Sequence, residues 1–248
     1  MKIKILGTQS PYSTEGHNCP GYMITSGDTK IILDCGSGIN SLLNFPNDLK
    51  DLNIIISHLH RDHYNDLFNL LYASFVFNKQ GRLEKRINVY LPETPKLTYE
   101  DILSEKDSYA KYEVIAENKE IFINNIKITF SKNEHPVETY SIKITDGVQT
   151  IIYTSDTSYS SKDKIVQFSN KADVLISEAS LLVSHGFPEI CNHLTAKQAA
   201  TIAKEANVKK LVLTHFWPEE ELNNYYKEAK EVFDNVIVAK EKNEIEIE

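Results

Sequence analysis

The sequence predicts an α/β fold in which two mixed β-sheets are flanked by helices. Short apolar segments separated by Gly, Ser and Asp dominate both ends of the chain, as expected for strands joined by turns. Helical patterns lie between them, which indicates layers of helix and sheet. No repeat, low-complexity tract or Pro/Gly linker marks a boundary. We therefore expect the whole chain, residues 1–248, to form one domain.

The first half is predicted to contain strands followed by two helices. A helix is expected at about 65–77, where Leu67, Leu70 and Leu71 recur at helical spacing, and another at about 99–109. The expected strands share an apolar, turn-bounded pattern and lie at 2–6, 21–25, 30–34, 53–57 and 87–91.

The second half is predicted to open with two hairpins and to continue with alternating strands and helices. The hairpins span 121–131, turning at Asn124-Asn125, and 140–154, turning at Asp146-Gly147. Thr195 is a suitable N-cap for a helix at 195–206, and Pro218 suits the first turn of a helix at 218–233. The remaining strands are expected at 174–177, 210–214 and 236–239.

Composition and charge exclude some classes of protein. Lys plus Arg number 27 against 35 Asp plus Glu, and the net charge of −8 disfavours general nucleic-acid binding. The densest basic stretch, at 81–86, is interpreted as a solvated turn, with a local basic patch as the alternative. No segment approaches the ~18 apolar residues of a membrane span, and the N-terminus does not resemble a signal peptide. We expect a cytoplasmic protein without a membrane partner.

The three cysteines, Cys19, Cys35 and Cys191, are widely separated and form no C-x-x-C pair. They suggest neither a disulfide framework nor a thiolate zinc site.

Histidines and aspartates instead follow the predicted strands. Ile54-Ile55-Ile56 runs directly into His58, His60, Asp62 and His63. Three further segments of this kind lead to His135, Asp156 and His215. Because strand ends can project side chains into a common cleft from a rigid support, this pattern predicts a metal site.

The mixture of imidazole and carboxylate indicates the metal. Two imidazoles at positions i and i+2 of an extended segment can point the same way, as His58 and His60 would. Such donors favour zinc, with manganese, iron or cobalt as alternatives. A chance cluster of surface histidines is the competing interpretation, and the three additional strand-borne residues argue against it.

These residues resemble the metallo-β-lactamase superfamily. The segment 58–63, H-L-H-R-D-H, is similar to its H-x-H-x-D-H signature, and Asp34-Cys35-Gly36 is similar to its early D-x-G turn. Residues 154–157 resemble its G-D-T stretch, with Ser155 in place of glycine. The resemblance implies an αββα sandwich that holds two metals at one edge of its sheets.

The resemblance also implies a role for each ligand. It assigns His58, His60 and His135 to the first metal, and Asp62, His63 and His215 to the second. Asp156 would bridge both. The family usually has a glycine three positions after the last histidine of the signature, where this chain has Asp66. We expect Asp66 to start a helix and not to bind metal.

Two further stretches resemble the ribonuclease Z branch of the superfamily. Residues 174–180 contain Glu178-Ala179-Ser180, similar to that branch's E-A-[ST] motif, and residues 193–200 are similar to its H-x-T-x-x-x-A-A stretch. The resemblance implies a hydrolase with Asp62, Glu178 and His193 as catalytic residues. His193, oriented by Glu178, would protonate the leaving alkoxide as general acid. The alternative is that Glu178 and His193 only pair structurally.

The predicted function is a dinuclear zinc phosphodiesterase that uses a metal-bound hydroxide. The tRNA-processing relatives carry an inserted arm that grips tRNA, whereas only 20 residues separate His135 from Asp156 and only 21 separate Asp156 from Glu178. A small molecule or short nucleotide is therefore the expected substrate, and a stable nucleic-acid partner is not expected. A hydrolase of carboxylic esters, thioesters or lactones remains the alternative; tRNA 3′ processing and non-enzymatic binding are less favoured.

Other residues have less specific signals. His17 and His185 lie in predicted loops where they could contact substrate or be ordinary surface residues. Tyr12, Tyr64 and Phe216 are candidates to line the pocket and stack a base. A homodimer is expected only because ribonuclease Z relatives usually pair.

Overall fold

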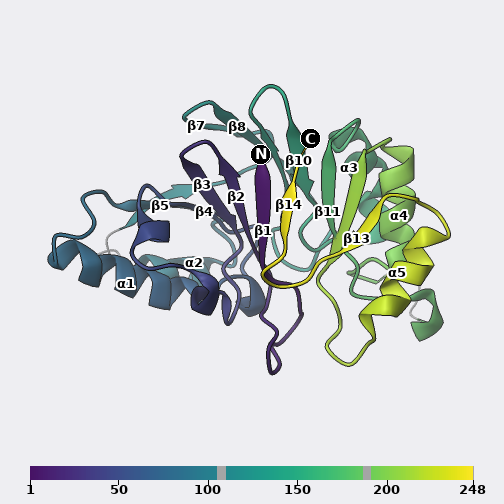
Figure 1. Ribbon diagram of the computed structural model, residues 1–248, viewed down its shortest axis with the longest axis horizontal. Helices are drawn as coiled ribbons and strands as arrows, with labels where there is room; N and C mark the ends of the chain where they lie inside the picture. The colour runs from purple at the N-terminus through teal and green to yellow at the C-terminus, as the bar shows by residue number, and fades with distance from the viewer. Residues whose placement is uncertain (105–109, 187–190, 248) are drawn as a thin grey trace. The chain divides into compact units, whose positions relative to one another are not determined.

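The structure is a computed structural model that describes residues 1–104, 110–186 and 191–247. The chain divides into two compact units. The first comprises 1–115 and 241–246, and the second comprises 116–240 and 247–248. Each unit contains one seven-stranded sheet (Figure 1). The prediction of two mixed sheets flanked by helices is confirmed; that the units form a single domain stays a prediction.

The first sheet is antiparallel on one side and parallel on the other. Its strand order is β14-β1-β2-β3-β4-β5-β6. Strands β14 to β3 pair antiparallel, and β3 to β6 pair parallel. The strands are β1 (Lys2–Gly7), β2 (Gly21–Ser26), β3 (Thr29–Leu33), β4 (Asn53–Ile55), β5 (Ile87–Leu91), β6 (Ala110–Val114) and β14 (Glu244–Glu246).

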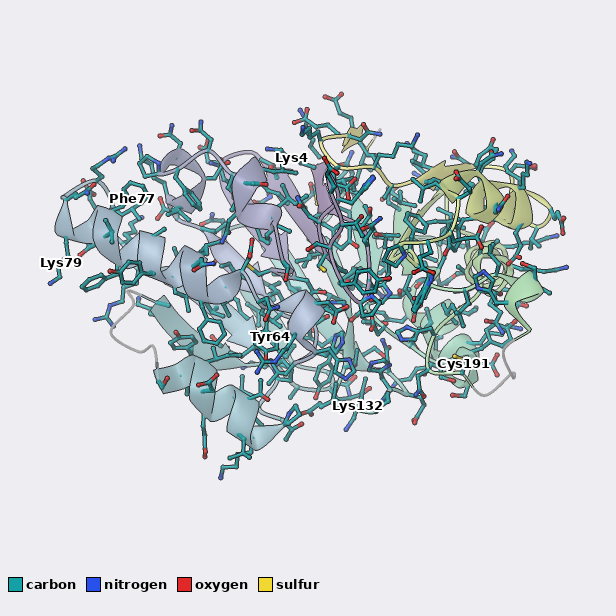
Figure 2. All side chains as sticks on the ribbon, turned by 90° about the horizontal axis from the view of Figure 1, so that it is seen from below. Lys4, Tyr64, Phe77, Lys79, Lys132 and Cys191 are labelled. Carbon is teal, nitrogen blue, oxygen red and sulfur yellow. The ribbon has the colours of Figure 1, made fainter. Side chains whose placement is uncertain are left out.

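Two helices pack on the parallel part of this sheet. They are α1 (Leu67–Lys79) and α2 (Lys96–Ser104). Leu67, Leu70 and Leu71 of α1 are fully buried in one cluster with residues of β3, β4 and β5. Figure 2 shows Phe77 and Lys79 near the end of α1. The leucines predicted at helical spacing therefore form the face by which α1 packs on the sheet.

The second sheet repeats this mixed plan with the order β13-β12-β11-β10-β9-β8-β7. Strands β7 to β10 pair antiparallel through two hairpins, and β10 to β13 pair parallel. The strands are β7 (Glu120–Ile123), β8 (Ile126–Lys132), β9 (Tyr140–Thr145), β10 (Thr150–Tyr153), β11 (Val174–Glu178), β12 (Lys210–Thr214) and β13 (Val236–Val238).

Helices α3 (Lys162–Phe168), α4 (Ala196–Glu205) and α5 (Leu222–Lys230) pack against this sheet. Helix α4 begins with the predicted cap. The Thr195 hydroxyl accepts a bond from the Gln198 amide, and the Gln198 side chain accepts one from the Thr195 amide. Its small residues, including Ala199, Ala200 and Ala203, are fully buried, so α4 lies close to the strands.

Some predicted elements differ from the structure. Strands β6 and β14 and helix α3 were not predicted with bounds, because their short segments mix charged and apolar residues. Helix α5 begins at Leu222 and not at Pro218, since residues 218–221 form a turn closed by the bond from the Glu220 amide to the Trp217 carbonyl. Helix α2 begins earlier than expected, and the predicted end at 105–109 lies outside the described residues.

Among the described residues, the helices are all too short or too polar to cross a bilayer.

We expect Thr195→Ala to lower the free energy of unfolding by about 1 kcal/mol, because the Gln198 amide at the start of α4 loses the hydroxyl oxygen that accepts its hydrogen bond. Thr201→Ala is the matched control, since its hydroxyl bonds only to the Lys197 carbonyl within the same helix. Urea denaturation measures both. An equal loss in the two variants would contradict a special role for the cap.

Candidate metal centre

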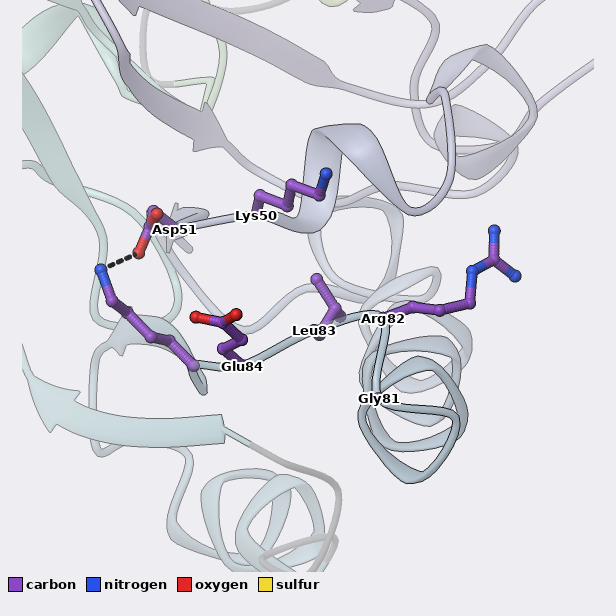
Figure 3. A pocket seen from close by; sticks show the side chains of 7 residues that line it. Lys50, Asp51, Gly81, Arg82, Leu83 and Glu84 are labelled. Carbon is purple, nitrogen blue, oxygen red and sulfur yellow. Dashed lines mark hydrogen bonds and ion pairs between the residues drawn. The ribbon is translucent and has the colours of Figure 1, made fainter.

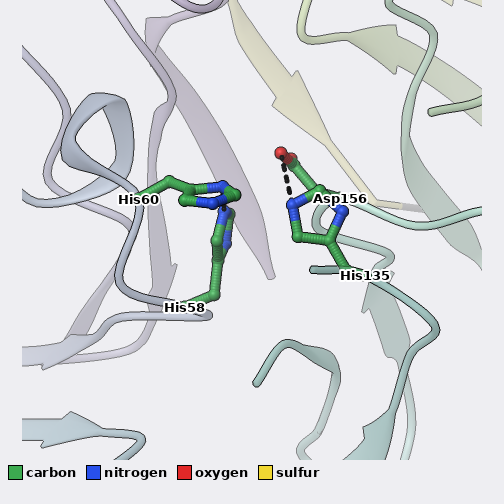
Figure 4. Close-up of side chains that lie close together, drawn as sticks. All are labelled: His58, His60, His135 and Asp156. Atoms are coloured by element: carbon green, nitrogen blue, oxygen red, sulfur yellow. Dashed lines mark hydrogen bonds and ion pairs between the residues drawn. The ribbon is translucent and has the colours of Figure 1, made fainter. Parts of the chain in front are cut away.

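In the first unit, a cluster of imidazoles and a carboxylate follows β4. The chain turns through Arg61–His63 after leaving the strand, which gathers His58, His60, Asp62 and His63. The His58 Nε2 lies 3.1 Å from the His60 Nδ1, and the rings of His58 and His63 are 4.1 Å apart between centroids. Figure 4 shows the His58 and His60 rings meeting edge to face.

A buried carboxylate, Asp34, fixes this cluster from behind. One of its oxygens accepts a bond from the Ser57 amide at 2.7 Å, and the other accepts from the Ser57 hydroxyl at 2.9 Å. That second oxygen also lies 2.7 Å from the His63 Nδ1. The Ser57 hydroxyl in turn lies 3.1 Å from the His58 Nδ1. Asp34 therefore orients His63 directly and His58 through Ser57.

The D-x-G turn of which Asp34 is part also needs its glycine. A side chain at Gly36 would place its Cβ 2.1 Å from the Asp62 carbonyl oxygen. Asp66 begins α1, as predicted, but its side chain does not cap that helix. Its carboxylate instead accepts bonds from the amides of Gly38 and Asn40 at 3.0 Å each. Asp66 thus holds the turn against the start of α1.

The loop after β1 contributes one contact to the same cluster. Ser10 donates a hydrogen bond from its hydroxyl to the Asp62 Oδ2 at 2.8 Å. On the other side, Asp62 Oδ2 lies 3.5 Å from the His63 Nε2. The Asp62 carboxylate is therefore held between a hydroxyl and an imidazole.

In the second unit, Asp156 lies between two histidines. It follows β10, and His215 follows β12. The His135 Nε2 lies 3.7 Å from one oxygen of Asp156, as Figure 4 shows, and the His215 Nε2 lies 3.0 Å from the other. Each oxygen of one buried carboxylate thus faces a different imidazole, which is the arrangement that a bridging ligand requires.

Glu178, at the end of β11, connects the loops of this unit. Its carboxylate is almost wholly buried. One oxygen accepts from the Thr157 amide at 2.8 Å and faces the His193 Nδ1 at 3.1 Å. The other accepts from the Ser180 hydroxyl at 2.9 Å and the Leu194 amide at 3.2 Å. The Ser180 hydroxyl lies 2.7 Å from the His215 Nδ1, so Glu178 also orients that histidine.

His193 is the most exposed imidazole in this cluster, with 30% of its side chain accessible. Burial would lower the pKa of His193, but the charge and hydrogen bond of Glu178, with a further contribution from Asp156, raise it to about 10. The predicted contact between Glu178 and His193 is therefore present, and it favours the protonated imidazole.

The donor atoms fit a divalent transition metal. The Nδ1 atoms of His58, His63, His135 and His215 each lie within 3.2 Å of an oxygen, from Ser57, Asp34, Asn192 and Ser180 respectively. Nε2 is then the nitrogen that would bind a cation, as in protein zinc sites. Asp156, His193 and His215 alone offer three donor atoms within 4.8 Å of one another.

Three site residues have a left-handed backbone that favours glycine. The φ angles are 57° at Asp34, 54° at Ser155 and 64° at His215. Such conformations cost about 1–3 kcal/mol each and persist where the surrounding structure requires them. Ser155 replaces the glycine of the G-D-T stretch, and it keeps the backbone shape that glycine would adopt more easily.

The sequence indicated a few further residues that could contact substrate, and the two histidines among them pair with carboxylates of the protein. His17 faces Glu241 at 3.2 Å, and His185 bonds Glu220 at 2.9 Å and the Leu182 amide at 3.2 Å. Tyr64 and Phe216 are buried in the cores of their units, whereas Tyr12 is 43% exposed. Whether any of them contacts substrate stays a prediction.

Residues 81–85 of the basic stretch line the pocket of Figure 3 together with Lys50 and Asp51. Lys85 pairs with Asp51 at 2.7 Å, and the Arg82 guanidinium lies over the Phe77 ring. Asp51 precedes β4, so this pocket lies at the opposite end of that strand from His58. The contacts favour the solvated turn over a basic patch.

Comparison with known proteins identifies the family. Residues 29–216 match the β-lactamase superfamily domain. The chain belongs to this superfamily. It is 32% identical over 244 residues to the probable metallo-hydrolase YhfI of Bacillus subtilis, covering 96% of each chain. The crystal structure of YhfI covers 98% of both chains with a TM-score of 0.90.

The predicted resemblance to ribonuclease Z is also confirmed. Ribonuclease Z of Archaeoglobus fulgidus is 25% identical over 305 aligned positions, covering 100% of this chain and 98% of the relative. The short form of human tRNase Z, at 20% identity, covers 100% of both chains with a TM-score of 0.73 and shows the fold alone. This chain therefore has the metallo-β-lactamase fold that its motifs predicted.

The sequence motifs contained two residues whose roles were not predicted. Asp34 lies within the D-x-G turn and Ser180 within the E-A-S motif, yet each serves a histidine more than 25 positions away. The only sequence feature that pointed to these two residues was that each belongs to a motif. The role needs the fold, because each contact joins separate strands.

We expect Asp34→Asn to weaken binding of zinc or manganese about 10- to 100-fold, because an amide cannot accept from Ser57 and orient His63 at once. Titration of metal-free protein by calorimetry measures the affinity. Asp28→Asn, in the exposed β2–β3 turn, is the control and should bind as the unmodified protein does. Equal affinity in all three proteins would show that Asp34 does not position the cluster.

Proposed function

We propose that the chain is a dinuclear zinc phosphodiesterase that cleaves a small or single-stranded phosphodiester. At the coarser level it is a hydrolytic enzyme, a metallo-hydrolase of the β-lactamase superfamily related to ribonuclease Z. The observation that carries the finer proposal is the Glu178–His193 pair, which offers a proton donor that ester hydrolysis does not require.

The proposed ligands are those implied by the resemblance. His58, His60 and His135 would hold one ion, Asp62, His63 and His215 would hold the other, and Asp156 would bridge them. The two oxygens of Asp156, each facing a histidine of its own unit, support a bridging role. The hydrogen bonds that tie Nδ1 in four of these histidines support ligation through Nε2.

The residues of the chain supply orientation and a proton. The bound ions would provide an activated water and stabilise the charge on the phosphoryl oxygens. Glu178 holds His193 through Nδ1, which leaves Nε2 to donate to the leaving oxygen. The Ser10 hydroxyl holds Asp62, which would serve as a ligand.

The chain lacks sequence that its ribonuclease Z relative contains. The alignment with the Archaeoglobus protein runs over 305 positions, more than the 248 residues of this chain. The two spacings that could accommodate an inserted arm are filled by β9 and β10, and by α3. With a net charge of −8, these observations support a small substrate over tRNA.

We expect zinc- or manganese-loaded protein to hydrolyse bis(p-nitrophenyl) phosphate or a cyclic nucleotide, and we expect a chelator to lower the rate by about two orders of magnitude or more. Restoring the metal should restore the rate. Asp156→Ala should lose metal content by elemental analysis as well as activity. Metal-loaded protein that is inert towards the whole panel would refute the phosphodiesterase proposal.

The second candidate is hydrolysis of a carboxylic ester, thioester or lactone, because the same ligands suit that reaction. The role of His193 separates the two. We expect His193→Ala and His193→Gln to lower cleavage of unactivated phosphodiesters by about 10²- to 10⁴-fold. The same variants should lose little activity towards p-nitrophenyl diesters, because the p-nitrophenolate leaving group needs no proton.

The activities of the His193 variants distinguish the two candidate functions. Ester hydrolysis that survives in both His193 variants, in a protein without phosphodiesterase activity, would establish the second candidate. A cytoplasmic location and a homodimer stay predictions from the sequence.

A further inference from the structure

The C-terminal segment of the chain places a buried carboxylate at the base of the loop between β1 and β2 in the first unit. We propose that this carboxylate, Glu241, is a positioning residue for the metal centre, because it closes the loop whose Ser10 hydroxyl bonds Asp62. The inference rests on the proposed function, in which Asp62 binds a metal ion. It adds to the site a residue from near the other end of the chain.

Backbone hydrogen bonds fix the C-terminal segment on β1. Strand β14 pairs antiparallel with β1 and lies beside it in Figure 1. Ahead of this pairing, the Lys242 amide donates to the Ile5 carbonyl and the Ile5 amide donates to the Asn243 carbonyl, each at 2.9 Å. These bonds hold Glu241 at the end of β1, where the loop begins.

The Glu241 carboxylate connects the two sides of the loop at its base. Its Oε1 accepts a bond from the Thr8 hydroxyl at 3.0 Å, on the side that leaves β1. The same oxygen accepts from the Asn18 amide at 3.3 Å, on the side that returns to β2, and Oε2 faces the His17 Nδ1 at 3.2 Å. The Glu241 side chain is 9% exposed, so these contacts replace the water that a carboxylate would otherwise bind.

The regular pairing of β1 with β2 stops before the base of the loop. In β1 it ends at Gly7, after a register shift. Beyond that point the Asn18 carbonyl accepts the amides of Thr8 and Gln9, whereas the Asn18 amide donates to Glu241. An amide withdrawn from water needs an acceptor, and here a side chain provides it. Removal of the carboxylate would therefore loosen one side of the base.

The loop closed in this way holds Asp62. Ser10 lies just beyond the base, is 7% exposed, and donates to the Asp62 Oδ2 at 2.8 Å. A looser base would give Ser10 more freedom, and the Asp62 carboxylate would lose a fixed partner. Because hydrogen-bond partners of metal ligands orient those ligands, Glu241 would affect metal binding through Ser10.

Hydrogen exchange in the metal-free protein tests the contact between Glu241 and the loop. We expect Glu241→Ala to speed exchange of the amides in residues 8–18 at least about fivefold, since the base of the loop loses its acceptor. Glu244→Ala is the matched control, because Glu244 lies on the same segment and pairs with Lys2 at the surface. It should leave this exchange unchanged. Unchanged exchange in Glu241→Ala would overturn the inference.

A double-mutant cycle on zinc affinity tests the connection from Glu241 to Asp62. We expect Ser10→Ala and Glu241→Ala each to weaken zinc binding about tenfold, as loss of a ligand's partner does. If Glu241 acts through Ser10, the double variant should bind zinc no more than about twofold more weakly than Ser10→Ala. Titration calorimetry of the metal-free proteins measures the four affinities. Losses that multiply in the double variant would overturn the inference.

The conservative variant Glu241→Gln separates positioning from a general loss of stability. Glutamine keeps a side-chain oxygen that can accept bonds from Thr8 and Asn18. Its zinc affinity should therefore stay within about twofold of that of the unmodified protein. An equal loss of affinity in the Gln and Ala variants would show that the loop does not need this acceptor, against the inference.

The two proposals fail differently, because exchange and zinc affinity do not depend on turnover. Coupled losses of zinc affinity in a protein that hydrolyses no phosphodiester would retain the role of Glu241 and refute the phosphodiesterase. Hydrolysis of phosphodiesters together with unchanged loop exchange in Glu241→Ala would do the reverse.

Discussion

The buried carboxylate of Glu178 is the constraint on which the second unit depends. It bonds the Thr157 amide next to Asp156, the Leu194 amide next to His193, and the Ser180 hydroxyl that contacts His215. Three loops that leave different strands are thereby fixed by one side chain. A buried carboxyl group is tolerated only where hydrogen bonds satisfy it, and here the donors that satisfy it also place the residues of the site.

The first unit uses the same physical device at Asp34. This carboxylate accepts from Ser57 and contacts His63, and so it joins the end of β3 to the loop after β4. The left-handed backbone at Asp34 is the cost of aiming the side chain inwards. The parallel strands β4 and β12 thus lead at their carboxyl ends into His58 and His215, whereas His135 follows the antiparallel strand β8. In each unit one buried carboxylate orients histidines of the site.

A hollow of about 370 Å³ adjoins His193 in the second unit. The capping residues Thr195 and Gln198, which start α4, also line this hollow. The proton donor and the pocket wall lie on adjacent segments of the second unit.

The sequence by itself determined the class of fold and most of the candidate site. Ile54-Ile55-Ile56 before three histidines, the turn at Asn124-Asn125 and the Thr195 cap are local patterns, and local patterns can be read without the fold. Strand β14 and the roles of Asp34 and Ser180 could not be predicted. They depend on contacts between distant segments, such as β14 with β1 or Ser180 with His215, and only the tertiary structure brings those segments together.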